Sequence, residues 1–500
     1  MAASISQQPS EYNKVVGPNT WVVTGIGSAD AYAIGIEVDG TLVATFQQPA
    51  NPAGVAIFDA SKVLQSYLSP EFQTPQKLTT TPYNPFEELP YGTNANENAN
   101  DTNGGTLFIR YRLRFGTVTS NVITWDGYSS SKYVINAYKP QYELDWDPTA
   151  TFHKPSLTLE ACASNPGDMG VTDKNWKYLT DFPYYDNNET NPALTGAAQR
   201  IASNEYATLS WFHEFDNEAD LDYNNFAAYL ITFDYYNAAG TLIEQHAIPL
   251  TESAAYISPR SDCNDLGPFT FATNEQIAQF GVGPQNLKDA DALGNYAVDL
   301  WISAPNEPNL DHYYVRIWTF NSCLYVDNSN PTLDCEDIGE LLDYANSKVY
   351  EMRYDYVSYD CQKFEPLRIS WINSFGTHDY YTFYKRNTET DSITRNNYYQ
   401  LPGTWSDSSF SVNPYDRGSR TFSTQITTDW TAQSDYMSEL EGEYLKSLFW
   451  SPSANFYWDG EWRSIEITSA SYEHQTFGRD KMFRYTINFR LAVNPRVQRG

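Results

Sequence analysis

The feature of this sequence that most constrains its fold is a period of two, in which apolar or aromatic side chains alternate with polar ones over short runs. Residues 106–115 read TLFIRYRLRF, and similar runs recur along the 500 residues. Asp39-Gly40 and Asp459-Gly460 each separate two such runs. This dipeptide favours the two-residue turn of a β-hairpin, because both of its positions need positive φ. The pattern predicts a mainly β protein, built of several β-sandwich-like modules with short helices.

One amphipathic helix is predicted near the carboxyl end, over residues 438–449. Ser438 and Glu441 fit a capping box, in which each side chain bonds the backbone N–H of the other residue. We expect one apolar face of this helix to pack on a C-terminal sheet formed by the following strands. The residues of that face, which are also taken as interface candidates, are Leu440, Tyr444 and Leu448. A shorter helix is predicted after Asp59 or Ser61.

Changes in composition divide the chain into four parts. Residues 1–138 and 204–347 carry strand-like runs and are predicted to be an N-terminal and a central β module. Residues 139–203 are rich in Pro, Asp, Asn and aromatic residues, which predicts an irregular linker or loop region. Residues 348–500 are predicted to be a C-terminal β module that contains the helix 438–449. Within this module we expect a turn-rich region over 387–418 and a strand at 421–428.

The charge balance argues against a nucleic-acid partner. The chain has 32 Lys and Arg against 62 Asp and Glu, a formal charge of −30, whereas binding phosphates requires Lys and Arg. No apolar run approaches the roughly 18 residues of a membrane helix. The amino-terminal residues show neither the basic nor the apolar region of a signal peptide. We therefore expect no nucleic acid, no membrane insertion and assembly in a cytoplasm.

The cysteines indicate no metal site. They are odd in number, widely spaced and without a partner His at zinc-finger spacing, which favours free, buried thiols. The five are Cys162, Cys263, Cys323, Cys335 and Cys361. A polar insertion at 91–105 is predicted to be a surface loop.

Motifs for catalysis are absent from the sequence. It contains no GxSxG, HExxH, P-loop or GxGxxG, and His213-Glu214 has no second His at the spacing of a zinc helix. We therefore expect no enzyme and no cofactor. One acidic loop leaves a calcium site open, through Asp216, Glu218, Asp220 and Asp222. The EF-hand template is not met, since Leu221 and Ala227 replace its Gly and Glu, so a solvated loop is the favoured interpretation.

Three arginines form a strip on the alternating run at 106–115. Arg110, Arg112 and Arg114 share one face, opposite the apolar residues. They are candidates for an interface with an acidic partner or a neighbouring copy. The alternative, which we favour, is a solvated strand face or internal salt bridges within this acidic chain.

Three stretches resemble a known class of proteins. The first contains Glu365-Pro366, Trp371-Ile372-Asn373, Gly376 and the run DYYTF at 379–383. A second has the sequence IFDASKVLQSYLS at 57–69. A third has the order Ser471-Tyr472, Thr476, Asp480-Lys481, Tyr485 and Phe489. In their order along the chain, 57–69, 365–383 and 471–489, the stretches resemble large, tail-associated virion structural proteins of tailed bacteriophages, of the kind found in phages of Bacteroidetes and aquatic bacteria.

The resemblance implies a function without catalysis. It implies a non-enzymatic structural protein of the virion, a multi-copy tail or tail-tip component that contacts copies of itself and other virion proteins. The alternatives are a carbohydrate-binding or receptor-binding module that recognises a host surface glycan, and a glycoside hydrolase. Exposed Trp and Tyr side chains suit the stacking of sugars, but they equally suit contacts between subunits.

Overall fold

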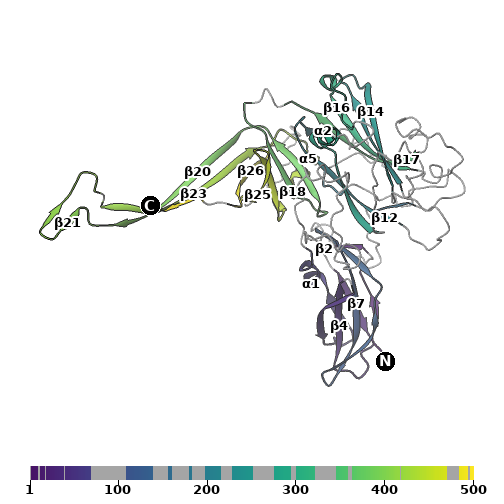
Figure 1. Cartoon of the computed structure of the whole chain (residues 1–500). Coiled ribbons are helices and arrows are strands. Elements are labelled where there is room, and N and C mark those ends of the chain that lie inside the picture. Colours follow the sequence, from purple (N-terminus) through teal and green to yellow (C-terminus); the bar gives the residue numbers. More distant parts are fainter. Residues whose placement is uncertain are drawn as a thin grey trace. The chain divides into compact units, whose positions relative to one another are not determined.

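The protein is mainly β, with several sheets and few short helices (Figure 1). The computed structural model describes residues 2–9, 12–16, 19–38, 40–68, 108–138, 156–159, 179–182, 198–215, 228–251, 275–293, 300–320, 345–358, 363–416, 418–469, 484–493 and 496–499. The chain divides into two compact units. Unit 1 comprises Met1–Ser358 and Ile372–Asp379, and unit 2 comprises Tyr359–Trp371 and Tyr380–Gly500.

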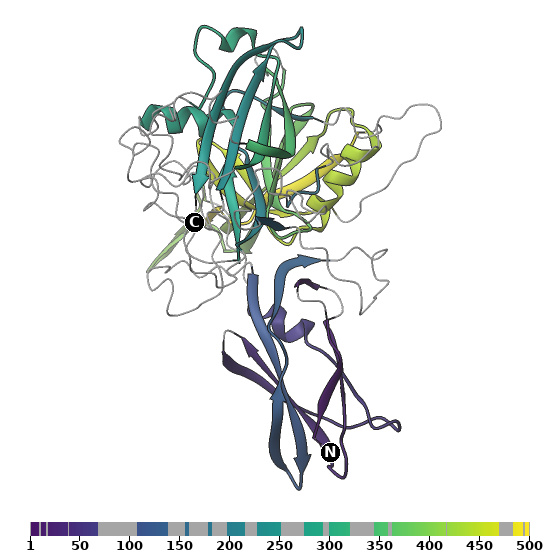
Figure 2. The same ribbon diagram turned by 90° about the vertical axis from the view of Figure 1, so that its right-hand side faces the viewer.

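The first part of unit 1 is a β-sandwich of two sheets that share one core (Figure 2). Trp21 of one sheet meets Tyr111 of the other edge to face, with ring centroids 6.2 Å apart, and both side chains are buried. The smaller sheet has the order β1 (Ser4–Gln7), β3 (Thr20–Thr24), β6 (Ala56–Asp59). The larger has the order β2 (Tyr12–Val16), β9 (Lys132–Tyr138), β7 (Phe108–Thr119), β4 (Ala31–Val38), β5 (Thr41–Gln48), and β8 (Val122–Tyr128) pairs with β7.

The local predictions for this sandwich are confirmed. Strands β4 and β5 pair antiparallel, as expected for a hairpin, and Gly40 between them has φ 78°. The predicted short helix is α1 (Ser61–Gln65), although its N-cap is Ala60 and not Asp59 or Ser61. Asp59 still serves the helix start, because its carboxylate accepts a hydrogen bond of 3.0 Å from the Ser61 backbone N–H.

The second part of unit 1 holds two further sheets and the helix α2 (Pro284–Leu293). The three-stranded sheet has the order β10 (Ser156–Leu159), β12 (Thr208–Phe215), β15 (Glu275–Gly281). The five-stranded sheet has the order β11 (Gln199–Ile201), β17 (Ala345–Tyr356), β16 (His312–Phe320), β13 (Ala228–Tyr236), β14 (Leu242–Thr251). Two of these strands, β10 and β11, come from the region read as a linker. Strand β17 contains residues 348–356, which the sequence placed with the C-terminal module.

Unit 2 is built on a sheet of eight strands. Their order is β19 (His378–Phe383), β18 (Leu367–Ile372), β24 (Ala454–Trp458), β25 (Glu461–Ile467), β26 (Thr486–Leu491), β23 (Ser419–Gln433), β20 (Asn387–Tyr399), and β27 (Arg496–Arg499) also pairs with β23. The turn at Asp459-Gly460 is confirmed, with φ 54° and 79°, as the type I′ hairpin requires. The predicted turn-rich region 387–418 is wrong over most of its first half, because β20 occupies 13 of those residues.

The predicted amphipathic helix is α5 (Glu439–Trp450), and its capping box between Ser438 and Glu441 is present. Tyr444 and Leu448 are buried, and Tyr444 packs on Trp371 of β18 with ring centroids 5.2 Å apart. The Trp371 indole N–H donates to Ser447 at 2.8 Å. The helix therefore packs on the C-terminal sheet. Among the residues described, no helix is long and apolar enough to cross a membrane.

Candidate assembly surface

A long two-stranded arm is the most unusual feature of unit 2. Strands β20 and β23 pair antiparallel from Asn387 opposite Ala432 to Tyr399 opposite Ser419. Strand β26 covers β23 only at 429–433, and β27 covers it only at 423–426. Beyond these contacts the ribbon continues with two strands, towards a small hairpin of β21 (Thr404–Ser406) and β22 (Ser409–Ser411) at its far end (Figure 1).

The arm exposes apolar side chains that a folded domain would bury. Of the 18 large hydrophobic side chains exposed among the described residues, eight lie between residues 393 and 422. We call this set the arm surface: Ile393, Tyr398, Tyr399, Leu401, Phe410, Val412, Tyr415 and Phe422. Tyr399 and Tyr415 are 76% and 77% exposed. A concentration of apolar surface of this kind marks an interaction site.

In the part of the chain that the structure describes, most side chains of β20 are left uncovered. Twelve of the 13 residues of β20 are exposed, so neither face of the strand is buried. Tyr398 and Phe422 pack on each other across the two strands, with ring centroids 6.5 Å apart. An isolated two-stranded hairpin is marginally stable in water. The arm is therefore suited to being covered by another chain.

The arm from Asn387 to Ala432 has three Arg against five Asp and Glu, a formal charge of −2, and its acidic residues lie mainly at its base. Residues 392–428 contain three arginines (Arg395, Arg417 and Arg420) and two aspartates (Asp407 and Asp416), a formal charge of +1 in a chain of −30. Repulsion between acidic surfaces opposes their contact. This segment can approach an acidic protein without that cost.

Two of the three predicted interface arginines have partners inside their own sheet. Arg112 donates to Glu37 at 2.7 Å, and Arg114 lies 4.0 Å from the same carboxylate. Their guanidinium groups also lie over the rings of Tyr128 and Trp125, at 4.2 and 4.6 Å. The internal pairing expected as the alternative is therefore what the structure shows for these two residues. Arg110 is half-buried on the same face of β7.

The helical interface candidates also lie inside the fold. Tyr444 and Leu448 are 2% and 0% exposed and hold α5 on its own sheet, so they are not open to a partner. The side chain of Leu440 lies outside the part that the structure describes. The calcium candidates Asp216, Glu218, Asp220 and Asp222, the loop 91–105 and the five cysteines lie outside the described residues. Within those residues no group of three His, Cys, Asp or Glu side chains is placed to hold a metal ion.

A pair of carboxyls in unit 1, buried Asp379 and half-buried Asp181, was not predicted. Asp379 accepts hydrogen bonds from the Thr180 hydroxyl at 2.5 Å and from the Asp181 backbone N–H at 3.0 Å. Asp181 in turn accepts hydrogen bonds from the backbone N–H of Ser374, at 2.8 Å, and from its hydroxyl. These bonds fix residues 179–182 against the turn between β18 and β19. No sequence pattern connects segments almost 200 residues apart.

The environment of this pair changes the acidity of Asp379. Burial raises the pKa of this carboxyl to about 8, and the nearby charge of Asp181 adds to the increase. Asp379 therefore carries a proton at neutral pH. Perturbed carboxyls occur at catalytic sites and in structural networks alike. Here the surrounding groups are hydroxyls and backbone amides that hold a turn, which is a structural arrangement.

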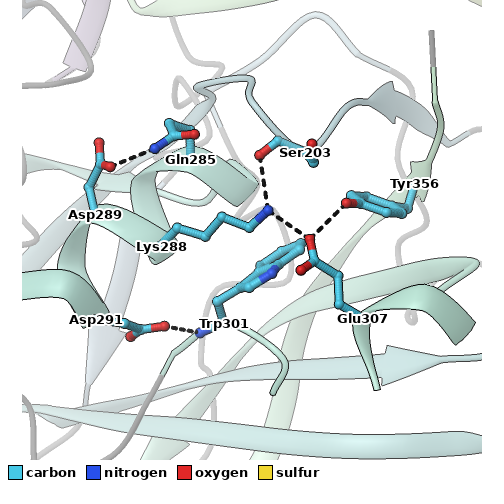
Figure 3. A network of polar contacts seen from close by, with 8 residues as sticks. All are labelled: Ser203, Gln285, Lys288, Asp289, Asp291, Trp301, Glu307 and Tyr356. Atoms are coloured by element: carbon cyan, nitrogen blue, oxygen red, sulfur yellow. Dashed lines mark hydrogen bonds and ion pairs between the residues drawn. The ribbon is translucent and has the colours of Figure 1, made fainter. Parts of the chain in front are cut away.

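A second polar network surrounds α2 (Figure 3). Lys288 donates to Glu307 at 2.7 Å and lies 5.0 Å from the ring centre of Trp301. Tyr356 of β17 donates to the same Glu307 oxygen at 2.9 Å. Burial alone raises the pKa of Glu307, but the hydrogen bonds from Lys288 and Tyr356 and the charge of Lys288 outweigh it, so the net pKa lies below its ordinary value. An ionised, paired Glu307 links α2 to β17.

The comparisons with known proteins identify no family. No protein-family model matches this chain, and no curated protein sequence matches it. A structure of the fibronectin(III)-like modules of CbhA from Clostridium thermocellum aligns with 73% of this chain and 98% of its own, at 7% identity and a TM-score of 0.13. At that TM-score the match carries no argument about fold or function.

Proposed function

We propose that this chain is a non-enzymatic structural protein of a tailed-phage virion, a multi-copy tail or tail-tip component that makes protein–protein contacts. The observation that carries the proposal is the arm surface. Eight exposed apolar side chains, four on the paired strands β20 and β23 and four in the segment between these strands, call for a protein partner. The segments around Trp371, α1 and Tyr485 resemble virion proteins of tailed phages, and this resemblance is the reason for proposing a phage particle.

The networks of titratable groups support a structural role. The hydrogen bonds that Asp379 and Glu307 accept hold separate chain segments together. A catalytic acid or base must instead be within reach of a substrate proton. Asp379 is 3% exposed, and the Glu307 oxygen already accepts hydrogen bonds from Lys288 and Tyr356.

The test is the incorporation of a chain with a shortened arm. Thr394 lies directly opposite Gln425, so residues 395–424 can be replaced by Asn-Gly, which closes two paired strands with a tight turn. Particles made with this variant should lack the chain or contain far less of it, as measured by mass spectrometry of purified virions. Normal incorporation would contradict the role of the arm.

A point substitution gives a finer version of the same test. Leu401→Ser removes one apolar side chain from the arm surface, and Leu242→Ser removes a similarly exposed leucine outside the arm. Both leucines are exposed, so neither change should alter folding. Incorporation should fall for Leu401→Ser and stay normal for Leu242→Ser.

A glycan-binding role is a second candidate, favoured by the exposure of Tyr399 and Tyr415. Exposed aromatic rings at the end of an arm suit stacking on a sugar. Under this alternative, Tyr399→Ala with Tyr415→Ala should abolish binding to host surface glycans and leave incorporation into particles unchanged. Under the proposed structural role, the same double variant should reduce incorporation.

A further inference from the structure

The outer edge of β20 is an open template for a further strand. β20 is the terminal strand of the eight-stranded sheet, and no other described strand pairs with its outer side. It contains neither Pro nor Lys, which commonly protect exposed edges, and its charged residues are Glu389, Asp391 and Arg395. The register shift in its pairing with β23 skips Phe422 of β23, so β20 itself runs without an extra residue. Thirteen consecutive residues are thus available for pairing.

We infer that β20 pairs antiparallel with β20 of a second copy of this chain, about a twofold axis at Ile393. The inference rests on the proposed assembly function, because it names the partner of the same arm. Ile393 is the middle residue of Asn387–Tyr399. A twofold axis at this residue therefore pairs the strand along its whole length, with Asn387 opposite Tyr399 and no overhang.

The charges of β20 are complementary to themselves in this register. Asp391 and Arg395 are four residues apart on an extended strand, so they lie roughly 13 Å from each other and cannot pair within one copy. Across the twofold axis Asp391 lies opposite Arg395 of the second copy, and the symmetry repeats the pair. Directly opposite Cβ atoms are roughly 4.5–5.5 Å apart, within reach of an ion pair.

The apolar side chains agree with the same register. Ile393 lies opposite Ile426 of β23 in its own copy, and it is 49% exposed. A twofold axis at Ile393 places it opposite Ile393 of the second copy. The joined sheet then carries four isoleucines side by side across one row, and each exposed Ile393 becomes covered. Strand β20 carries Glu389, Asp391 and Arg395, a formal charge of −1, so two copies of this strand meet with little net repulsion.

The neighbouring register is less favourable. An axis at Ser392 places Glu389 opposite Arg395, but it also places the Asp391 carboxylate opposite Ile393 and leaves Tyr399 unpaired. Burying a carboxylate against an apolar side chain costs free energy that an opposite charge does not recover there. The two registers also differ in which acidic residue meets Arg395, and the experiment uses this difference.

The experiment is a charge reversal across the proposed axis, read by sedimentation velocity of the purified full-length chain over a range of concentrations. Asp391→Arg places two arginine pairs face to face, and Arg395→Asp places two aspartate pairs face to face. Each should raise the dimer dissociation constant by about tenfold or more. The double variant restores opposite charges and should return the constant to within about threefold of the wild type.

Glu389→Arg is the matched control. It makes the same change of charge on the same strand, but it lies opposite Asn397 in the proposed register and should have an effect below about threefold. Far-ultraviolet circular dichroism checks that every variant is folded. The double variant also loses the Thr428 hydroxyl bond to Asp391, so its recovery separates the effect of charge from the loss of that bond.

Each alternative result overturns the inference. A wild type that stays monomeric, or a dimer that neither single reversal weakens, shows that β20 is not the interface. A double variant that fails to recover, or a large effect of Glu389→Arg, shows that the register is wrong. None of these results concerns presence in particles. A chain found in virions with no β20 pairing leaves the proposed function standing, and a dimer absent from virions removes the proposed function alone.

Discussion

The hydroxyl of Tyr444 closes the outer edge of β19, and its removal is a sharp test of how unit 2 is held together. The hydroxyl accepts a hydrogen bond from the Tyr380 backbone N–H at 3.1 Å and donates one to the Tyr380 carbonyl oxygen at 2.8 Å. Both residues are buried, at 2% and 3% exposure. A single side-chain atom thus serves one donor and one acceptor of an edge strand.

Tyr444→Phe keeps the ring on Trp371 and removes only this hydroxyl. A buried backbone group that loses its partner costs about 1–3 kcal/mol. Two such groups give an expected loss of roughly 2–4 kcal/mol after some relaxation. Native-state hydrogen exchange, read by mass spectrometry on peptides that contain Tyr380, should show protection reduced by roughly 30- to 700-fold.

Tyr436→Phe is the control for this prediction, because it removes the same atom from a ring that is 51% exposed. Its exchange at Tyr380 should match the wild type. Equal protection in the two variants would refute the account, since the Tyr444 hydroxyl would then contribute nothing to the edge of β19.

Three further predictions concern the cores and the polar networks. Leu448→Asp should unfold unit 2, because it places a carboxylate at a position with 0% exposure, and a normal circular dichroism spectrum would contradict this. Burial raises the pKa of Asp379 in the folded chain to about 8, far above the pKa of an unfolded aspartate. The protonated carboxyl therefore contributes fully to the stability of the folded chain at low pH, and this contribution is lost as the pH rises towards 8. Thermal unfolding of Asp379→Asn should therefore depend less on pH between about 4 and 8 than that of the wild type, and equal slopes would show that the carboxyl is not protonated. Arg112→Gln should destabilise the sandwich more than Glu37→Gln does, by on the order of 1 kcal/mol in urea unfolding. The reason is that Arg112→Gln leaves the buried Glu37 carboxylate short of a partner, whereas Arg112 is 41% exposed and can be hydrated when Glu37 is neutralised. A larger loss of stability in Glu37→Gln would contradict this argument.

The elements that the sequence predicted are those with a local cause. The turn Asp459-Gly460 needs positive φ at two adjacent residues, and the capping box at Ser438 is a contact between residues three apart. The strand β7 alternates because one of its faces is buried, with Ile109, Tyr111 and Leu113 inside. In each case the physical cause lies within a few residues and leaves a pattern in the sequence.

The elements that were not predicted depend on residues far apart in the sequence, or on surfaces that nothing in the described part of the chain covers. Strand β20 shows no period because neither of its faces is buried, so NTETDSITRNNYY reads as turns. Asp379 and Asp181 are almost 200 residues apart in the sequence, so no local pattern connects them. The candidate site shares this property, because an exposed arm is defined by what the rest of the chain fails to cover. Its one sequence signal is a cluster of tyrosines and phenylalanines in a segment with almost no net charge.

The central claim is that this chain is a multi-copy structural component of a phage particle. The most direct measurement is quantitative mass spectrometry of purified virions, with isotope-labelled peptides of this chain measured against peptides of the major capsid protein. The account predicts several copies per particle, in a constant ratio to the capsid protein. Absence from purified virions, or a ratio below one copy per particle, would contradict it.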